Sequence, residues 1–261
     1  MPEHISLLHY VLYRLGFLRE NSPIDHSFSG AHLGYRDYEP VFMALVMMVV
    51  VIYLTTEVRA TVKRMRDAVI PEEELTLRTF FEVFLEYFYN MAKEVMGAKN
   101  AKRFFPIIGA SALFIFFSNA MGMVPGMLPP TSSLNVTAGC ALFVFLAFNY
   151  YGLKENGFEY IKHMSGWGIF KGFLPNLALA LIIFPIEVIS LCVRPITLAI
   201  RLMLNMAVDH LLVAIFMGFF ALFLPLPIMF LGLIVIVVQT LVFCLLTAIY
   251  IGLATEHAEA H

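Results

Sequence analysis

Charged residues are scarce in this chain of 261 residues: Asp, Glu, Lys and Arg make up 14% of it, whereas soluble domains usually carry about 25%. Hydrophobic residues make up 60%, and the mean hydropathy is +0.82. A single soluble core cannot bury so much apolar surface, so the composition predicts a protein that lies in a lipid bilayer. The net charge of −2 and the lack of a basic cluster among aromatic residues argue against a nucleic-acid partner.

Cysteine is also rare, and a phosphate-binding motif is missing. Cys140, Cys192 and Cys244 are far apart within apolar runs and have no CxxC spacing. We expect them to be small buried hydrophobic residues, with no metal site and no cofactor. The chain contains no GxxxxGK[ST] loop, so it is not expected to bind nucleotide or to be an enzyme by itself.

Long apolar runs are what the sequence has instead. The first predicted span, 40–58, contains VFMALVMMVVVIYLTT and is followed by Arg59, Lys63, Arg64 and Arg66. A run of this length can cross a hydrocarbon core, and basic residues favour the cytoplasmic side. Residues 1–39 are therefore predicted to form an outer N-terminal segment.

The next segment, 71–98, mixes apolar and charged residues. Phe80, Phe84, Phe88 and Met91 recur at helical spacing, and charges persist on the other faces. This pattern is typical of an amphipathic helix in the inner membrane interface. A basic amphipathic helix that binds a soluble partner is the alternative.

Residues 104–153 are predicted to form a helical hairpin. The stretch MVPGMLPPTSS, at 123–133, interrupts an otherwise uncharged run, because proline and glycine end helices and favour turns. The tip of the hairpin would lie outside. Asn119, near that tip, would either line water or form a hydrogen bond to a neighbouring helix.

The last predicted element, 173–255, is a long helical hairpin. Its first arm has roughly fifty residues and would extend about 75 Å as a straight helix. Because the membrane core is only about 30 Å thick, this arm must tilt steeply or bend, for example at Pro185 or Pro195. The expected fold is all-α and polytopic: a single membrane domain, 1–261, with about five transmembrane helices, the interfacial helix and a cytoplasmic C-terminus.

Ionisable residues are concentrated on this arm. Glu187, Arg194 and Arg201 recur every seven residues, so they share one helical face, and Asn205 lies on it too. An internal ion pair between Glu187 and Arg194 is possible, but Glu187 and Arg201 are about 21 Å apart along a helix. Charges inside a membrane are costly and usually mark an ion path.

An arginine restricts the mechanism of such a path. Its pKa exceeds about 12, so it cannot accept and release protons. As a fixed cation it lowers the pKa of a nearby carboxyl group. Glu187, Asp209 and His210 can titrate, whereas Asn205 and the Gln239 of the facing arm can hold water. Titratable groups on either side of a fixed cation indicate a path split into two halves.

Three stretches resemble a known family. RPITLAIRLMLNMAVDHLL (194–212), VVQTLVFCLLTAIYIGLATEH (237–257) and FSNAMGMVPGMLPPTSSLNVT (117–137) are similar, in order, to sequences of subunit a of F-type ATP synthases. The chain departs from the family pattern at Leu204 and Asp209, where many members have glycine, and at Gly232, where many have histidine or glutamate.

The resemblance implies a proton-translocating stator subunit that forms two half-channels against a ring of c subunits. Arg201 would block a leak between the halves and deprotonate the ring carboxylates. The implied ion-translocation residues are Arg201, Glu187, His210, Asn205, Gln239, Asp209 and Asn119. The implied partners are the c-ring, a b-type peripheral stalk, the rest of the ATP synthase and membrane lipid, in a bacterial inner membrane. The alternatives are a self-contained secondary ion-coupled transporter and a membrane subunit with an assembly role only.

Overall fold

The computed structural model describes residues 35–64, 76–124, 127, 129–164, 173–219 and 225–256. In these ranges the chain forms helices without strands: α2 (Tyr35–Arg64), α3 (Leu77–Met121), the 3₁₀ helix η1 (Pro130–Ser132), α4 (Leu134–Met164), α5 (Phe173–Phe219) and α6 (Pro225–Glu256). Five of these helices are long and apolar enough to cross a membrane. The predicted all-α, polytopic fold class is therefore confirmed. Most of the predicted outer segment 1–39 lies outside the described residues.

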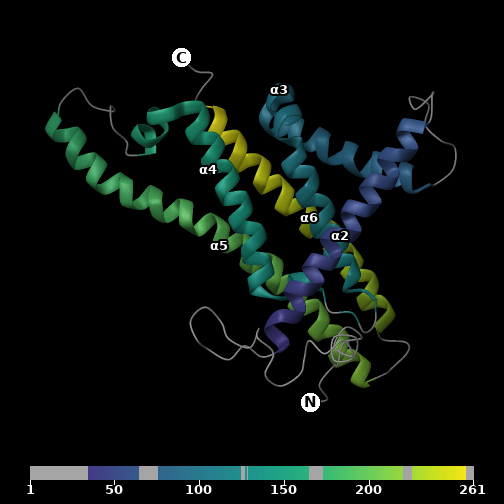
Figure 1. The fold of residues 1–261 in the computed structure, drawn as a ribbon. Coiled ribbons are helices and arrows are strands. Elements are labelled where there is room, and N and C mark those ends of the chain that lie inside the picture. Colours follow the sequence, from purple (N-terminus) through teal and green to yellow (C-terminus); the bar gives the residue numbers. More distant parts are fainter. Residues whose placement is uncertain are drawn as a thin grey trace.

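Helix α3 is broken near its middle. Gly97 has φ 78° and ψ 160°, and it separates a first arm (77–96) from a second arm (98–121). Aromatic side chains join the arms: ring centroids are 5.3 Å apart for Tyr89 and Phe105, and 5.0 Å apart for Phe84 and Phe116. The arms thus form a narrow V that closes at Gly97 (Figure 1). The interfacial location predicted for 71–98 stays a prediction.

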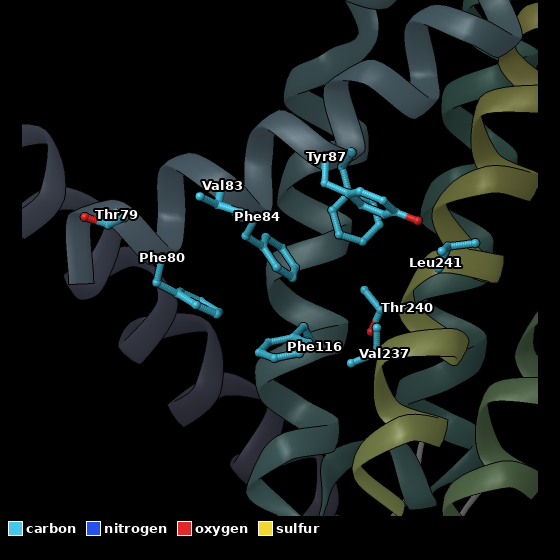
Figure 2. Close-up of a pocket in the computed structure, with 10 residues that line it drawn as sticks. Thr79, Phe80, Val83, Phe84, Tyr87, Phe116, Val237, Thr240 and Leu241 are labelled. Carbon is cyan, nitrogen blue, oxygen red and sulfur yellow. The ribbon is translucent and has the colours of Figure 1, made fainter. Parts of the chain in front are cut away.

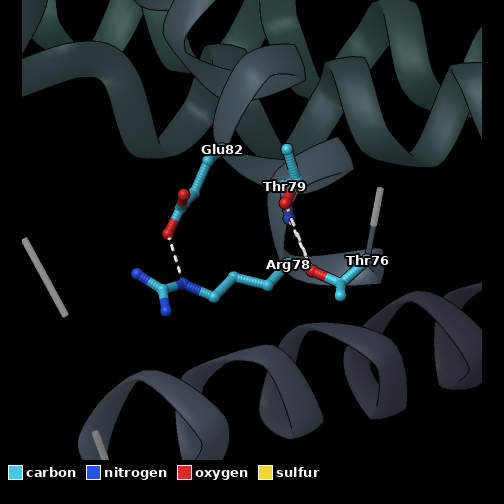
Figure 3. Close-up of polar contacts among 4 residues, drawn as sticks. All are labelled: Thr76, Arg78, Thr79 and Glu82. Carbon is cyan, nitrogen blue, oxygen red and sulfur yellow. Dashed lines mark hydrogen bonds and ion pairs between the residues drawn. The ribbon is translucent and has the colours of Figure 1, made fainter. Parts of the chain in front are cut away.

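The first arm begins with a capped turn. The Thr76 side chain accepts a hydrogen bond from the Thr79 backbone N–H, and the Arg78 Nε lies 2.7 Å from a Glu82 carboxylate oxygen (Figure 3). Arg78 is buried, with 4% of its surface exposed. A cap and an ion pair of (i, i+4) spacing stabilise the start of a helix. Residues 71–75, where the sequence predicts this helix to begin, lie outside the described part of the chain.

The core lies where α3, α4 and α6 pack together. Small residues such as Ala92, Ala101, Ala112 and Ala248 are completely buried there. Small side chains let membrane helices approach closely, which is the usual basis of helix association in lipid. Large rings, including those of Phe104, Phe148 and Phe243, fill the remaining space. Helix α6 is therefore enclosed by its neighbours in this region.

Helix α5 is only partly covered. It has 47 residues and runs obliquely across most of the molecule (Figure 1). Leu191, Leu198, Leu202 and Met206 are buried. The opposite side carries exposed aliphatic side chains between residues 186 and 215: Ile186, Ile189, Val193, Ile196, Ile200, Leu204, Val208, Leu211 and Ile215. We call this set the open face of α5. An apolar surface of this extent faces lipid or a partner.

The cysteines only partly match their predicted burial. Cys244 is buried and Cys140 half-buried, whereas Cys192 is exposed. The prediction was wrong for Cys192 because its helix, α5, is uncovered on one side. An apolar neighbourhood in the sequence does not distinguish a protein core from a lipid-facing surface.

Replacing Gly97 by alanine is expected to destabilise α3. Its φ and ψ lie in a region that essentially only glycine adopts, at a cost of about 1–3 kcal/mol for other residues. A methyl group at this position would meet nothing within 4 Å, so strain in the backbone is the only penalty. Gly139, in α4, is the matched control because it also has open space but no such backbone. Immunoblots of membranes should show less chain for Gly97→Ala and an unchanged amount for Gly139→Ala. Equal amounts would contradict the role assigned to Gly97.

Candidate functional site

Arg201 lies exposed beside the open face of α5. Its neighbours Ile200 and Leu204 are 40% and 48% exposed. Within the part of the chain that the structure describes, no acidic side chain forms an ion pair with Arg201. The guanidinium therefore projects from an apolar surface without a counter-charge from the described residues of its own chain. A cation in such surroundings needs an acid from another molecule, since an isolated charge in lipid is costly.

Arg194 is held differently, two turns earlier on the same helix. It is half-buried, and its guanidinium carbon lies 5.2 Å from the centroid of the Tyr250 ring of α6. This is cation–π geometry. The alternative ion pair between Glu187 and Arg194 is absent from the described residues, where both side chains are placed. Arg194 thus ties α5 to α6, and Arg201 is left facing outward.

Asn205 and Gln239 are brought together across the two long helices. The Asn205 side-chain N–H donates to the Gln239 side-chain oxygen, with 2.5 Å between nitrogen and oxygen. Gln239 is buried, with 4% exposure, and Asn205 is half-buried. Because Asn205 follows Arg201 by one helical turn, this amide pair lies close to the cation. It provides neutral donors and acceptors between the two helices and leaves Arg201 unneutralised.

His210 lies where α5 meets the tip of the α3–α4 hairpin. A Cβ built on Gly122 would be 2.8 Å from the His210 Nε2 atom and 3.1 Å from the Pro129 side chain. His210 follows Arg201 by nine residues, or about 14 Å along the helix. Asp209 is half-buried beside it and forms no ion pair with any described residue. The hairpin tip is therefore in contact with the titratable end of α5.

Asn119 lies at the same tip and is completely buried. The Thr131 hydroxyl donates to its side-chain oxygen over 2.6 Å. Of the two possibilities open in the sequence, the structure shows a hydrogen bond, although to η1 rather than to a long helix. The Asn119 Nδ2 atom and the Ser118 Oγ atom are buried and have no hydrogen-bond partner among the described residues. The tip thus contains polar atoms that its own side chains do not satisfy.

Glu187 stands apart from the other candidates. It is half-buried on α5, fourteen residues before Arg201, and far from the hairpin tip that contacts His210. The candidates therefore divide into Glu187 on one side of Arg201, and His210, Asp209 and Asn119 on the other. Such a distribution suits two polar routes that meet at one cation.

A large cavity elsewhere does not belong to this set. It has a volume of about 490 Å³ and lies between the two arms of α3 and helix α6 (Figure 2). Apolar atoms form almost all of its wall, including the rings of Phe80, Phe84 and Phe116. It cannot carry ions, because it has too few polar groups to replace their hydration. No group of three or more potential metal ligands occurs among the described residues.

Sequence reasoning missed Thr131, Gly122 and Tyr250. Thr131 offered one signal, a hydroxyl residue following two prolines at a hairpin tip. Gly122 and Tyr250 offered none, because their importance depends on which helix lies opposite.

Comparison with known proteins adds independent information. The sequence profile of the family described as ATP synthase A chain matches residues 41–252. A protein named ATP synthase subunit a from Sorangium cellulosum is 59% identical over the full length of both chains. Proteins of the same name from Sulfurihydrogenibium sp. and Geobacter sulfurreducens are 38% and 40% identical, over 84% and 71% of this chain and 98% and 76% of theirs.

Proposed function

The chain belongs to the ATP synthase A chain family, the proton-translocating stator subunits of the membrane sector Fo, and on this basis we propose that Arg201 is the fixed charge that separates the two half-channels. The observation that carries this proposal is an exposed guanidinium on an apolar helix face with no acid partner among the described residues. Family membership also implies that the chain is a multi-pass membrane protein and part of the ATP synthase.

The counter-charge would come from the ring of c subunits. Each ring carboxylate that reaches Arg201 would lose its proton, because a nearby fixed cation lowers the pKa of a carboxyl group. The open face of α5 would be the surface against which the ring turns. Its exposed aliphatic side chains suit contact with an apolar partner, and Arg201 is the charge beside it.

Protons would use the two polar routes on either side of Arg201. On the outer side, His210, Asp209 and Asn119 would admit protons to a ring carboxylate. On the inner side, Glu187 would receive protons from the ring after its rotation. Asn205 and Gln239 would hold water beside the cation. Arg201 itself cannot pass a proton on, so it would prevent a direct leak between the routes.

The orientation of the chain in the membrane and the energy supplied by proton flow agree with this scheme. Nine lysines and arginines lie between residues 59 and 103, and none follows Arg201. By the preference of basic residues for the cytoplasmic side, this distribution supports an N-terminus outside and a C-terminus in the cytoplasm. Each elementary charge that crosses 100 mV supplies about 2.3 kcal/mol, so several protons are needed for each ATP. Nucleotide would bind elsewhere in the complex, and a b-type peripheral stalk would hold this subunit against rotation.

Cross-linking tests the proposed ring contact. In a background with Cys192→Ser, which removes an exposed native thiol, Leu204→Cys is alkylated with a maleimide that carries a photoactivatable group. On illumination it should cross-link to a c subunit in the intact complex. Leu204 is 48% exposed on the open face of α5, whereas Leu202, two residues earlier, is completely buried. Leu202→Cys is therefore the control, and its yield should stay at background. A Leu204→Cys chain that never cross-links to c subunits would refute the contact.

A further inference from the structure

The tip of the α3–α4 hairpin contains a buried cluster of three polar side chains, of which Asn119 is only one. Ser118, Asn119 and Thr131 each have no exposed surface. The Thr131 hydroxyl binds one end of the Asn119 side-chain amide, while the other end and the Ser118 hydroxyl have no partner in the part of the chain that the structure describes. If the amide were turned over, Thr131 would still bind one end and leave the other unpaired. The cluster therefore has free hydrogen-bonding capacity in either orientation.

Such capacity indicates water. An unsatisfied buried polar group costs more than an ordinary hydrogen bond contributes. Native proteins usually satisfy such groups with an ordered internal water that makes several hydrogen bonds. Ser118 and Asn119 are adjacent at the end of α3, so both can contribute to one water site.

Thr131 is in a rigid position. It lies in η1, where Pro130 occupies the first helical position and the Ser133 N–H donates to the Pro130 carbonyl over 3.3 Å. The short helix contacts α2, α3, α4 and α5. Four surrounding helices thus fix the direction of the Thr131 hydroxyl, and through it the orientation of the Asn119 amide.

The cluster is one helical turn from the His210 contact. The Gly122 backbone N–H donates to the Asn119 carbonyl over 3.0 Å, and a Cβ on Gly122 would be 2.8 Å from the His210 Nε2 atom. A water held by Ser118 and Asn119 would therefore lie in the same small region as the imidazole. Water both donates and accepts hydrogen bonds, so it can pass a proton toward His210.

We propose that Thr131 is a positioning residue of the outer half-channel: its hydroxyl orients the Asn119 amide so that Asn119 and Ser118 hold an internal water on the proton route to His210. This inference rests on the proposed function, in which Asn119 and His210 belong to the outer route. Thr131 acts through Asn119 and does not itself exchange protons.

The test measures passive proton flux through Fo. Complexes that carry each variant are reconstituted in liposomes without the catalytic sector, and flux under an imposed membrane potential is divided by the amount of assembled Fo. Thr131→Val keeps the shape of the side chain but removes the hydroxyl. Flux should fall about fivefold, which is the rate equivalent of the free energy of one net hydrogen bond. Thr131→Ser keeps the hydroxyl and should retain nearly normal flux.

A double-mutant cycle separates positioning from a structural role. Asn119→Ala should lower flux, and Thr131→Val combined with Asn119→Ala should lower it no further, because residues that act as a unit are not additive. Asn119→Ser replaces Asn119→Ala if the alanine variant does not assemble. If the flux of the double mutant were lowered by the product of the two single effects, the inference would be overturned. A Thr131→Val complex that assembles poorly but has normal flux per complex would also overturn it.

Failure of the inference can be told apart from failure of the proposed function. If His210→Ala and Asn119→Ala lower flux while Thr131→Val leaves it normal, the role of Thr131 is refuted and the outer route stands. If His210→Ala and Asn119→Ala both leave flux normal, the proposed outer route is wrong and the inference falls with it.

Discussion

Arg201→Ala is expected to abolish ATP-driven proton pumping and proton-driven ATP synthesis in membrane vesicles. Without the guanidinium, a ring carboxylate would reach the middle of the membrane with no cation to stabilise its charged form. It would keep its proton, and the two half-channels would no longer be separated. Both activities should fall to the background of vesicles that lack the complex, measured by quenching of a pH-sensitive dye and by luciferase.

The control for this substitution is Ile200→Ala, which removes a large exposed side chain next to Arg201 without removing charge. Pumping by Ile200→Ala should remain measurable, since the ring contact is spread over many aliphatic side chains. Native gels of both variants should contain the whole complex. Normal pumping by Arg201→Ala would remove the role proposed for this residue.

Gly122→Ala is expected to have the second-largest effect. The added Cβ would be 2.8 Å from the His210 Nε2 atom, 3.0 Å from the Met206 Cε atom and 3.1 Å from the Pro129 Cβ atom. Overpacking of this kind typically costs about 1–3 kcal/mol. The methionine can move, but Pro129 is rigid, so His210 must be displaced. We expect ATP synthesis by vesicles to fall about tenfold, the rate equivalent of about 1.4 kcal/mol, near the lower end of that range.

Gly232→Ala is the matched control, because a Cβ on Gly232 would meet nothing within 4 Å. It should synthesise ATP at the normal rate. If Gly122→Ala also behaved normally, the close contact between the hairpin tip and α5 would not exist in the working complex. The outer route would then have to reach Arg201 without His210.

Family membership argues against the two alternative functions that the sequence left open. A self-contained secondary transporter and a subunit with an assembly role only both predict a chain unrelated to the proton-translocating subunits of Fo. The match over residues 41–252 and the full-length relative contradict that expectation. The absence of an acid partner for Arg201 among the described residues is consistent with this outcome, because a self-contained transporter would need its counter-charge within the same chain.

Much of this protein was determined by its sequence alone. Apolar runs bounded by charges predicted the all-helical, polytopic fold class. In lipid every backbone N–H and C=O group must be hydrogen-bonded within the protein, and a helix satisfies them within one segment. The seven-residue spacing placed Glu187, Arg194 and Arg201 on one face for a purely geometric reason. The stretch around Arg201 also indicated the family, since its residues are close in sequence and need no tertiary contact to be recognised.

Tertiary structure decided the partners of these residues. The sequence allowed Arg194 to pair with Glu187, but packing of α5 on α6 placed it over Tyr250 instead. The bond from Thr131 to Asn119, the contact of Gly122 with His210 and the exposure of Cys192 depend on which helices meet and which side stays uncovered. Periodicity along one helix cannot predict these features, because the neighbours come from distant parts of the chain.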